Sequence, residues 1–483
     1  MSNELATMDA TAQAELVRSG EASPAELVDA AIERIEALNG ELNAVIHPLF
    51  DKAREAGSGR LPDGPFRGVP ILLKDVFGES AGDPYHEGMK HLRDLAWVSE
   101  ADDYLVARYR RAGFVICGKT NVPEIGILPT TEPETYGATR NPWDTARSPG
   151  GSSGGAGAAV GAGMVPVAQG GDGGGSIRIP ASACGLVGLK TSRGRTTMGP
   201  LGEPASGLNV MHVLTRSVRD CAAILDVTHG AAPGDPYTAP PPDRPYADEL
   251  AADAGRLRVG VMTSAPASLF EVHPDCVGAA EAAGELLESL GHAVETSHPE
   301  ALDDPDYIDR FIARWCAGIA VTLEYWGLKS GKPVGPEGVE ASTWALAEAG
   351  RQVSAVDLLG VLAYQQGSAR DVAAWWEGGF DLLLTPTMGE PPTPLGAFTP
   401  DPADPAGVLR RSVPTAGFTA YWNATGQPAI SLPLHWSDEG LPIGIQLVAP
   451  YGREDLLIRV AAQLEQARPW AERRPPVFAA AAA

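Results

Sequence analysis

Basic residues are scarce in this 483-residue chain, which has 37 lysines and arginines, 61 aspartates and glutamates, and a formal net charge of -24. A strongly acidic surface repels phosphates, so we expect no nucleic-acid partner. Cysteine is rare as well: the five cysteines are odd in number and include no CxxC pair. This argues against a disulfide framework or a zinc site, and it favours a reducing compartment.

Long apolar runs are also absent. No uncharged apolar stretch approaches the roughly 20 residues that cross a bilayer. The N-terminal segment MSNELATMDA has neither the basic nor the apolar part of a secretory signal. We therefore expect no membrane association and a cytoplasmic location. The content of 44% hydrophobic and 20% charged residues is typical of a globular protein with a large core.

Strand and helix patterns alternate along the chain. Ser23-Pro24-Ala25-Glu26 is a capping-box start for a helix through Leu38. The alternation predicts an α/β fold, with a mainly parallel or mixed sheet covered by helices on both faces. Strands are expected at 69–73, 114–117, 164–168, 257–262, 293–296, 380–385 and 444–448, and helices at 102–112, 156–163, 217–229, 274–290, within 307–325, within 343–376 and at 454–467.

Glycine and serine are concentrated in two segments, 148–155 (SPGGSSGG) and 170–178 (GGDGGGSIR). So much glycine would weaken a purely structural segment. Glycine is favoured where backbone N–H groups approach a ligand or a developing negative charge. Apolar residues such as Val160 and Val165 separate the two segments and require packing, so the tract is not a flexible linker. It indicates an active site.

Two shorter motifs are weaker. Segment 113–120 (GFVICGKT) matches the P-loop pattern, but its bulky apolar middle is typical of a strand and not of a phosphate-binding loop. Segment 150–154 (GGSSG) matches the nucleophile elbow of α/β-hydrolases. That motif needs a strand directly before the serine, where this chain has the turn-like sequence RSPGG.

A serine nucleophile needs a base, and a buried lysine can supply one because burial disfavours its charged form. Lys74 ends the apolar run 69–73, which would carry its side chain into the interior. The local pattern equally allows a lysine that emerges into water. Lys74, Ser152 and Ser176 together would form a Ser-Lys variant of the hydrolytic triad.

The chain resembles the amidase signature family. Segment 150–195 is similar to the family's defining segment nearly end to end, and GVPILLKD, GKTNVPE, TRNPW and QPAISLPL extend the resemblance. The resemblance implies a large, twisted, mixed β-sheet covered by helices. It also implies one amidase domain, 1–483, with a signature core at about 66–230, a substrate-shaping insertion at about 231–380 and a C-terminal return to the core.

The resemblance also implies residue roles. Ser176 would be the acylated nucleophile, and Ser152, on a cis peptide bond, would connect it to Lys74. The implied reaction is amide hydrolysis through an acyl-enzyme, with no metal or cofactor. Gly171 and Gly173 stand where many members carry threonine. The expected oxyanion donors are the N–H groups of Gly173, Gly174, Gly175 and Ser176, and the expected supports are Ser153, Asp172 and Arg178.

Substrate preference is less constrained. An uncharged cyclic or linear aliphatic amide is the expected substrate class, and an aryl-acylamidase, a urethane or ester hydrolase and a tRNA-dependent amidotransferase subunit remain alternatives. Family resemblance also implies a homodimer. Aromatic residues and one cysteine C-terminal to the signature are pocket candidates, although each would equally fill a core: Trp315, Cys316, Trp344, Tyr421 and Trp422.

Overall fold

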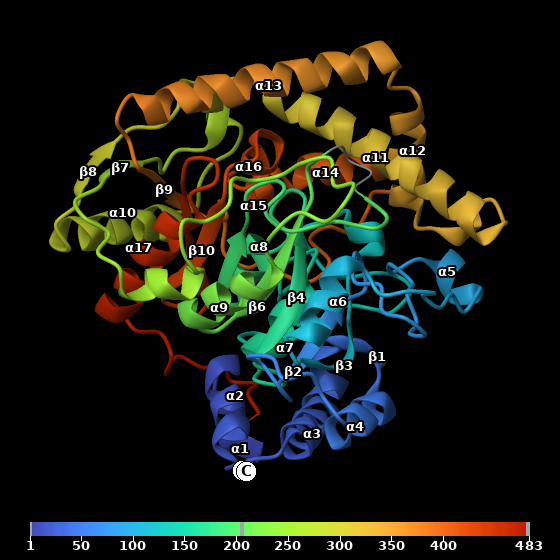
Figure 1. Cartoon of the computed structure of the whole chain (residues 1–483). Helices are drawn as coiled ribbons and strands as arrows, with labels where there is room; N and C mark the ends of the chain where they lie inside the picture. Colours follow the sequence, from blue (N-terminus) through green and yellow to red (C-terminus); the bar gives the residue numbers. More distant parts are fainter. Residues whose placement is uncertain (1, 203–206, 480–483) are drawn as a thin grey trace.

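The computed structural model describes residues 2–202 and 207–479. Within these residues, eleven strands form one mixed sheet in the order β1-β3-β2-β4-β6-β5-β10-β11-β9-β7-β8 (Figure 1). The predicted fold class is therefore confirmed. The strands are β1 (Val45–Pro48), β2 (Pro70–Lys74), β3 (Val115–Thr120), β4 (Val167–Asp172), β5 (Val187–Lys190), β6 (Val210–Thr215), β7 (Arg258–Val261), β8 (Ala293–Thr296), β9 (Leu382–Pro386), β10 (Ala429–Trp436) and β11 (Pro442–Val448).

Helices surround this sheet, with α1 to α4 at the bottom and α11 to α13 at the top of the view in Figure 1. Their bounds are α1 (Ser2–Thr7), α2 (Ala10–Ser19), α3 (Pro24–Leu42), α4 (Phe50–Ser58), α5 (Lys90–Asp94), α6 (Tyr104–Arg111), α7 (Gly154–Gly161), α8 (Arg178–Cys184), α9 (Val218–Thr228), α10 (Pro274–Ser289), α11 (Tyr307–Ser330), α12 (Ala341–Arg351), α13 (Ala355–Glu377), α14 (Val408–Arg411), α15 (Val413–Ala416), α16 (Ala420–Thr425) and α17 (Glu454–Ala467).

Strand β2 is covered on both faces. Successive strand side chains point to opposite faces. Ile71 and Leu73 belong to one core cluster, with residues of α6 and α9, whereas Leu72 belongs to another, with residues of α3 and α7. All five residues of β2 are buried. This explains why the strand reads as a continuous apolar run that ends in Lys74.

The parallel pairing of β2 and β4 positions the candidate site. Ile71 is paired with Val167 and Leu72 with Ala168. The carboxyl ends of parallel strands meet at the same edge of a sheet, where ligands commonly bind. Lys74 ends β2 and Asp172 ends β4, so both residues lie at this edge.

Most predicted elements are present, and some have the predicted bounds. The capping box at Ser23 and Glu26 is formed, and α17 covers 454–467 as expected. Strand β4 lies three residues later than the predicted strand, because Gly170, Gly171 and Asp172 pair with β6. Part of the glycine tract is therefore sheet and not loop. The predicted insertion contributes β7 and β8 at one edge of the same sheet.

Candidate active site

Lys74 is a buried lysine whose nearest polar partners are uncharged. Its side chain is 1% exposed at the end of β2. The Nζ atom donates to Ser152 Oγ at 2.7 Å and to the backbone oxygen of Gly171 at 3.2 Å. It has no carboxylate ion-pair partner in the described part of the chain. The lysine is therefore buried, not solvated at the strand end.

This environment changes the acidity of Lys74. Burial lowers its pKa from 10.5 to about 7, although the negative charge of Asp172 opposes the shift. A substantial fraction of Lys74 is therefore neutral near pH 7. A neutral amine 2.7 Å from a serine hydroxyl is placed to accept its proton.

Ser152 lies just before α7 and follows a cis peptide bond from Gly151. Gly151 is tightly enclosed: a Cβ at this position would lie 2.3 Å from the backbone oxygen of Thr130. Only glycine fits there. The next serine, Ser153, holds the adjacent strand, since its Oγ donates to Gly171 O at 3.2 Å and accepts from Gly171 N at 3.3 Å.

Ser176 lies between the end of β4 and the start of α8. Its hydroxyl lines one small cavity together with Lys74 and Ser152. The backbone N–H of Ser153 donates to the carbonyl of Ser176 at 3.3 Å, which ties the two glycine-rich segments together. The structure thus brings together the three predicted catalytic residues, which are 78 and 24 positions apart in sequence.

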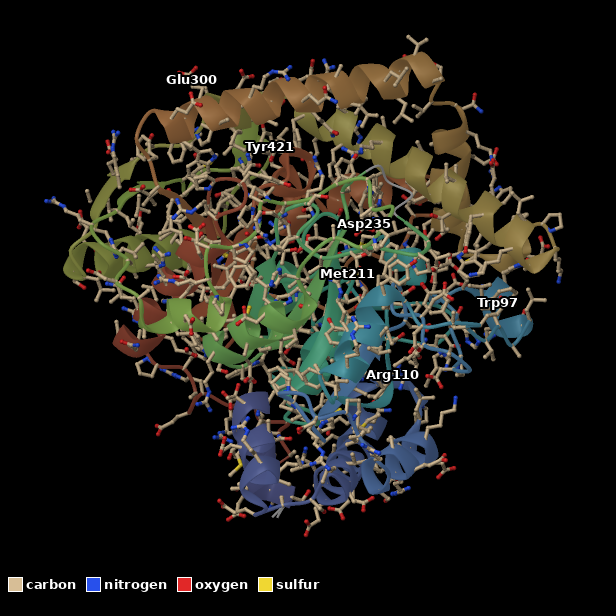
Figure 2. All side chains as sticks on the ribbon, in the orientation of Figure 1. Trp97, Arg110, Met211, Asp235, Glu300 and Tyr421 are labelled. Carbon is tan, nitrogen blue, oxygen red and sulfur yellow. The ribbon has the colours of Figure 1, made fainter. Side chains whose placement is uncertain are left out.

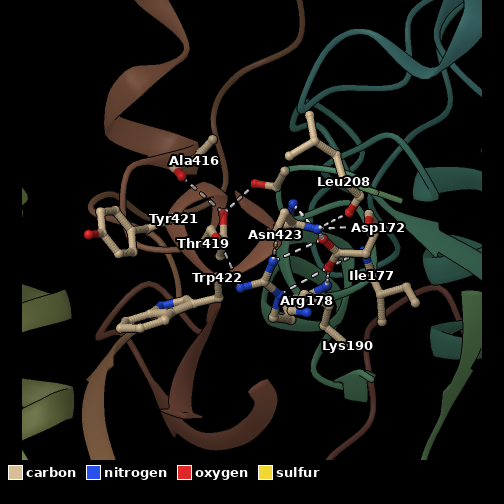
Figure 3. A network of polar contacts seen from close by, with 12 residues as sticks. Asp172, Ile177, Arg178, Lys190, Leu208, Ala416, Thr419, Tyr421, Trp422 and Asn423 are labelled. Carbon is tan, nitrogen blue, oxygen red and sulfur yellow. Dashed lines mark hydrogen bonds and ion pairs between the residues drawn. The ribbon is translucent and has the colours of Figure 1, made fainter. Parts of the chain in front are cut away.

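Asp172 and Arg178 form the centre of a buried polar network (Figure 3). Both side chains are fully buried, and Arg178 Nη2 lies 2.9 Å from Asp172 Oδ1. Arg178 Nη1 also donates to Thr419 O at 2.9 Å and to Gln446 Oε1 at 2.7 Å. Asn423 Nδ2 donates to Asp172 Oδ1 at 2.9 Å. These contacts join the nucleophile loop to α16 and β11.

The charge of Asp172 is well compensated. Burial alone would raise its pKa, but Arg178 and the hydrogen bonds to the carboxylate hold the pKa well below its usual range. Asp172 therefore stays ionised near neutral pH. It also shapes the loop directly, because it accepts from Gly175 N at 2.7 Å and from Ile177 N at 3.1 Å.

One of the four expected oxyanion donors, the N–H of Gly175, has a different partner. The N–H of Gly175 is directed at Asp172 and not at the cavity. The N–H groups of Gly173, Gly174 and Ser176 have no acceptor among the described residues. Gly175 is needed for another reason: its φ is 138°, and a Cβ there would lie 2.3 Å from Thr419 Oγ1.

The structure explains the two glycines that replace threonine. A Cβ on Gly171 would lie 2.8 Å from the sulfur of Met211, the residue labelled near the centre of Figure 2. A Cβ on Gly173 would lie 2.3 Å from Asn209 Oδ1 and 3.1 Å from the ring of Trp315. Larger neighbours therefore fill the space that a threonine side chain would need.

Two cavities meet at Ser176. The first, of about 60 Å³, is lined mainly by apolar side chains, among them Ile127, Ile179 and Phe311. The second, of about 50 Å³, contains Lys74 and Ser152. Trp315, one of the five pocket candidates, lines both cavities.

The other four pocket candidates line neither of these two cavities. Cys316 is buried on α11, where its carbonyl lies against Gly350 of α12. Trp344 packs beneath the guanidinium of Arg351 at 5.1 Å. Tyr421 and Trp422 belong to the core beneath α13, where Tyr421 is labelled in Figure 2.

Several site residues were missed by the sequence reasoning. Asn423 and Gln446 complete the network around Arg178, and Asn209 lines the catalytic cavity. No local pattern distinguishes these amides. Phe311 and Thr322 are different, because they lie about one helical turn before and two turns after Trp315, a spacing that would have placed them on its face of α11.

Within residues 2–202 and 207–479, no cluster of histidine, cysteine and acidic side chains is arranged to hold a metal ion. The five cysteines are all buried and free. None of the helices in these ranges is both long enough and apolar enough to cross a bilayer.

Comparison with known proteins agrees with this geometry. The amidase family model matches residues 26–458. The 6-aminohexanoate-cyclic-dimer hydrolase of Pseudomonas sp. (strain NK87) is 46% identical over 97% of each chain. A solved structure of 6-aminohexanoate cyclic dimer hydrolase complexed with substrate has a TM-score of 0.95 at 45% identity, and covers 98% of this chain and 99% of that one.

A more distant structure, a bacterial aryl acylamidase of the amidase signature family, has a TM-score of 0.86 at 26% identity and covers 99% of each chain. The family match spans most of the chain, and the relatives match over nearly their full length. Together with the lysine and two serines around one cavity, these matches establish that the chain belongs to the amidase signature family and hydrolyses amide bonds.

Proposed function

We propose that this protein hydrolyses small uncharged amides through an acyl-enzyme on Ser176, and that 6-aminohexanoate cyclic dimer is among its substrates. The observation that carries the catalytic assignment is the hydrogen bond of 2.7 Å from buried Lys74 to Ser152, in a cavity that also contains Ser176. A base of lowered pKa, a relay hydroxyl and a nucleophile are the three parts that acyl transfer needs.

The reaction begins with attack of Ser176 Oγ on the amide carbonyl carbon. The Ser176 proton passes to Ser152 Oγ as the Ser152 proton passes to neutral Lys74 Nζ. The C–N bond then breaks, and the same relay returns a proton to the leaving nitrogen. Water then attacks the acyl-enzyme while the relay carries its proton to Lys74. The bond between the acyl carbon and Ser176 Oγ breaks, the proton returns from Lys74 through Ser152 to Ser176 Oγ, and the acid is released.

The negative charge that develops on the carbonyl oxygen is bound by the N–H groups of Gly173, Gly174 and Ser176. Removing one such donor typically costs about 3–4 kcal/mol of transition-state stabilisation. Asp172 keeps the loop in position by holding Gly175 N and Ile177 N. It takes no part in proton transfer, because Arg178 holds its carboxylate ionised.

The apolar cavity next to Ser176 supports the substrate assignment. Ile127, Ile179 and Phe311 contribute to its wall, and no charged side chain lines it. An aliphatic acyl chain fits such a surface without leaving a charge unpaired. The named relative of 46% identity supports the cyclic dimer in particular.

The experiment is an assay of the purified protein on 6-aminohexanoate cyclic dimer, an anilide and a carbamate, with Ser176→Ala as control. We expect hydrolysis of the cyclic dimer and loss of all activity in Ser176→Ala. Full activity in Ser176→Ala, with an inert Ser152→Ala that no serine-directed inhibitor labels, would show that the nucleophile is misassigned. Strong preference for the anilide would favour the runner-up, an aryl-acylamidase, which the structural similarity to such an enzyme supports.

We also propose that the protein is a homodimer and that it acts without any different partner subunit. Activity of the isolated chain on simple amides separates this from the amidotransferase alternative. Light scattering during size-exclusion chromatography measures the mass in solution, and twice 50.4 kDa is expected.

A further inference from the structure

A third and larger cavity continues from the catalytic one. It has a volume of about 260 Å³ and shares Val76, Phe77, Ile125 and Thr322 with the cavity that contains Lys74 and Ser152. The two cavities are therefore adjoining, with these four residues between them. The larger cavity reaches the surface beside Val321, which is 50% exposed.

The position of the proton relay decides which half of a substrate enters this side. A proton must reach the leaving nitrogen from Ser152, which lines the second cavity but not the first. The leaving amine therefore lies in the second cavity, and its substituent extends into the third. The acyl chain takes the apolar first cavity on the other side of Ser176.

The third cavity combines aromatic walls with one buried carboxylate. Phe77, Tyr85, Tyr325 and Trp326 form much of its lining, and the acidic group is Glu87. Glu87 accepts from Tyr85 Oη at 2.8 Å and from Trp326 Nε1 at 2.9 Å. These two donors fix the carboxylate but bring no positive charge.

No cation of the described residues forms an ion pair with Glu87. Two lysines lie close to rings of the lining: Lys329 is 5.0 Å from the ring of Trp326 and pairs with Glu79 at 3.4 Å, and Lys119 is 4.8 Å from the ring of Tyr85. Burial raises the pKa of Glu87 to about 7, although its two hydrogen bonds lower it. Binding a cation would relieve this penalty on the charged form.

We infer that the third cavity is a subsite for a cationic leaving group, so that the substrates extend beyond uncharged amides, and an amide whose amine half carries a second, protonated amine is preferred to a neutral amide of the same length. A desolvated carboxylate beside aromatic rings is the usual chemistry for recognising an alkylammonium ion. The net charge of -24 also attracts a cation toward the enzyme. This inference rests on the proposed function for the position of the scissile bond, but not for the presence of the subsite.

The test uses three hexanoyl amides whose amine halves have nearly the same length. They are made from 1,5-diaminopentane, hexylamine and 6-aminohexanoate, so they end in an ammonium, a methyl and a carboxylate group. For the wild type, kcat/KM is expected to fall in that order. Glu87→Gln should reduce the ammonium-to-methyl ratio roughly tenfold, since a hydrogen bond to a charged group is worth about 1.5 kcal/mol or more.

Glu79→Gln is the matched control. Glu79 is equally buried and acidic and lies in the same region, but it does not line the cavity. Its replacement should leave the ammonium-to-methyl ratio of kcat/KM within about twofold. This result would distinguish direct contact with Glu87 from attraction by the negative charge of the region. Tyr325→Leu changes one partly buried residue of the wall and leaves Glu87 unaltered, and a loss of about threefold in the ratio is expected from a removed cation–π contact. An unchanged ratio in both Glu87→Gln and Tyr325→Leu would overturn the inference.

A binding measurement keeps the two proposals apart. Calorimetry with Ser176→Ala and hexylammonium, against hexanol, needs no turnover. Binding of hexylammonium that Glu87→Gln abolishes supports the subsite even if none of the amides is hydrolysed, in which case the proposed function fails alone. Hydrolysis without any dependence on terminal charge, and no binding of hexylammonium, leaves the function intact and refutes the subsite.

Discussion

Lys74 and Arg178 are both buried cations near the same glycine-rich loop, but they have opposite surroundings. Arg178 has an ionised partner at 2.9 Å, and its donors reach Asp172, Thr419, Asn423 and Gln446. Lys74 has only a hydroxyl and a carbonyl. Burial without a paired charge turns a lysine into a base near neutral pH, whereas burial with a paired charge produces a fixed support.

The largest effect on activity is expected from removal of the unpaired cation, Lys74. Lys74→Met should reduce kcat/KM by roughly 10²–10⁴-fold, the contribution typical of general base catalysis. Fold stability should not fall, because no opposite charge is left unpaired. Steady-state kinetics and thermal unfolding measure the two effects.

Lys119→Met provides the matched control for that change. Lys119 is also fully buried on the neighbouring strand β3, but it lines neither cavity at Ser176. Activity close to wild type is expected. If Lys119→Met were as inactive as Lys74→Met, the loss would reflect buried charge in general and not a base.

Removal of the paired cation tests the opposite side of the comparison. Arg178→Met leaves Asp172 charged and buried, so the free energy of unfolding should fall by about 3–5 kcal/mol. Urea denaturation followed by tryptophan fluorescence measures it. The exposed ion pair of Arg54 with Asp29 is the control, and Arg54→Met should cost at most about 1 kcal/mol. Equal losses would contradict the distinction.

A pH series distinguishes the two cations without any mutation. Because Lys74 must be neutral and its pKa is about 7, kcat/KM should fall about tenfold per pH unit below pH 7 and be level above it. In the unfolded chain Lys74 has its ordinary pKa of 10.5, so between about pH 7 and pH 10.5 the unfolded chain binds more protons than the folded chain. Wild-type stability relative to Lys74→Met should therefore rise across that interval. A rate profile that stays level down to pH 5 would exclude Lys74 as the base.

The smallest expected effect is that of a substitution at Gly173, in the loop between Lys74 and Arg178. Gly173→Ala places a Cβ against Asn209 and Trp315, so overpacking of about 1–3 kcal/mol is expected in stability or in the activation barrier. Trp315→Leu in the same chain should restore part of the loss. If Gly173→Ala alone were neutral, the side chains of Asn209 and Trp315 would be free to move, and the explanation for the missing threonines would fail.

The residues of the glycine-rich segments were predictable because their chemistry is local. Lys74, Ser152 and Ser176 stand in long motifs, and an apolar strand before Lys74 predicts its burial. The strand β4 was placed three residues early because glycine suggests a loop, whereas pairing with β6 decides the matter. No strand was predicted at β1, β5, β6 or β10, since short apolar runs carry little periodicity.

The substrate side was less predictable because it depends on helix orientation. Trp315 and Cys316 are neighbours, yet an α-helix turns about 100° per residue, so Trp315 lines the cavity and Cys316 is buried in a core cluster that includes Leu346 of α12. Aromatic character alone cannot distinguish Trp315 from Trp344. The amides of Asn423 and Gln446 lie more than 240 positions after Arg178, beyond the reach of any local pattern.

The contacts of Arg178 with Asn423 and Gln446 have a consequence for synthesis of the chain. A ribosome makes the nucleophile segment long before it makes the residues that hold it in place, 245 and 268 positions later. A nascent or truncated polypeptide that ends before Gln446 therefore carries every catalytic side chain but lacks a finished active site. We therefore expect enzyme activity only after nearly all of the chain has emerged, and we expect two co-expressed fragments divided in the 231–245 connection to be active only once they associate.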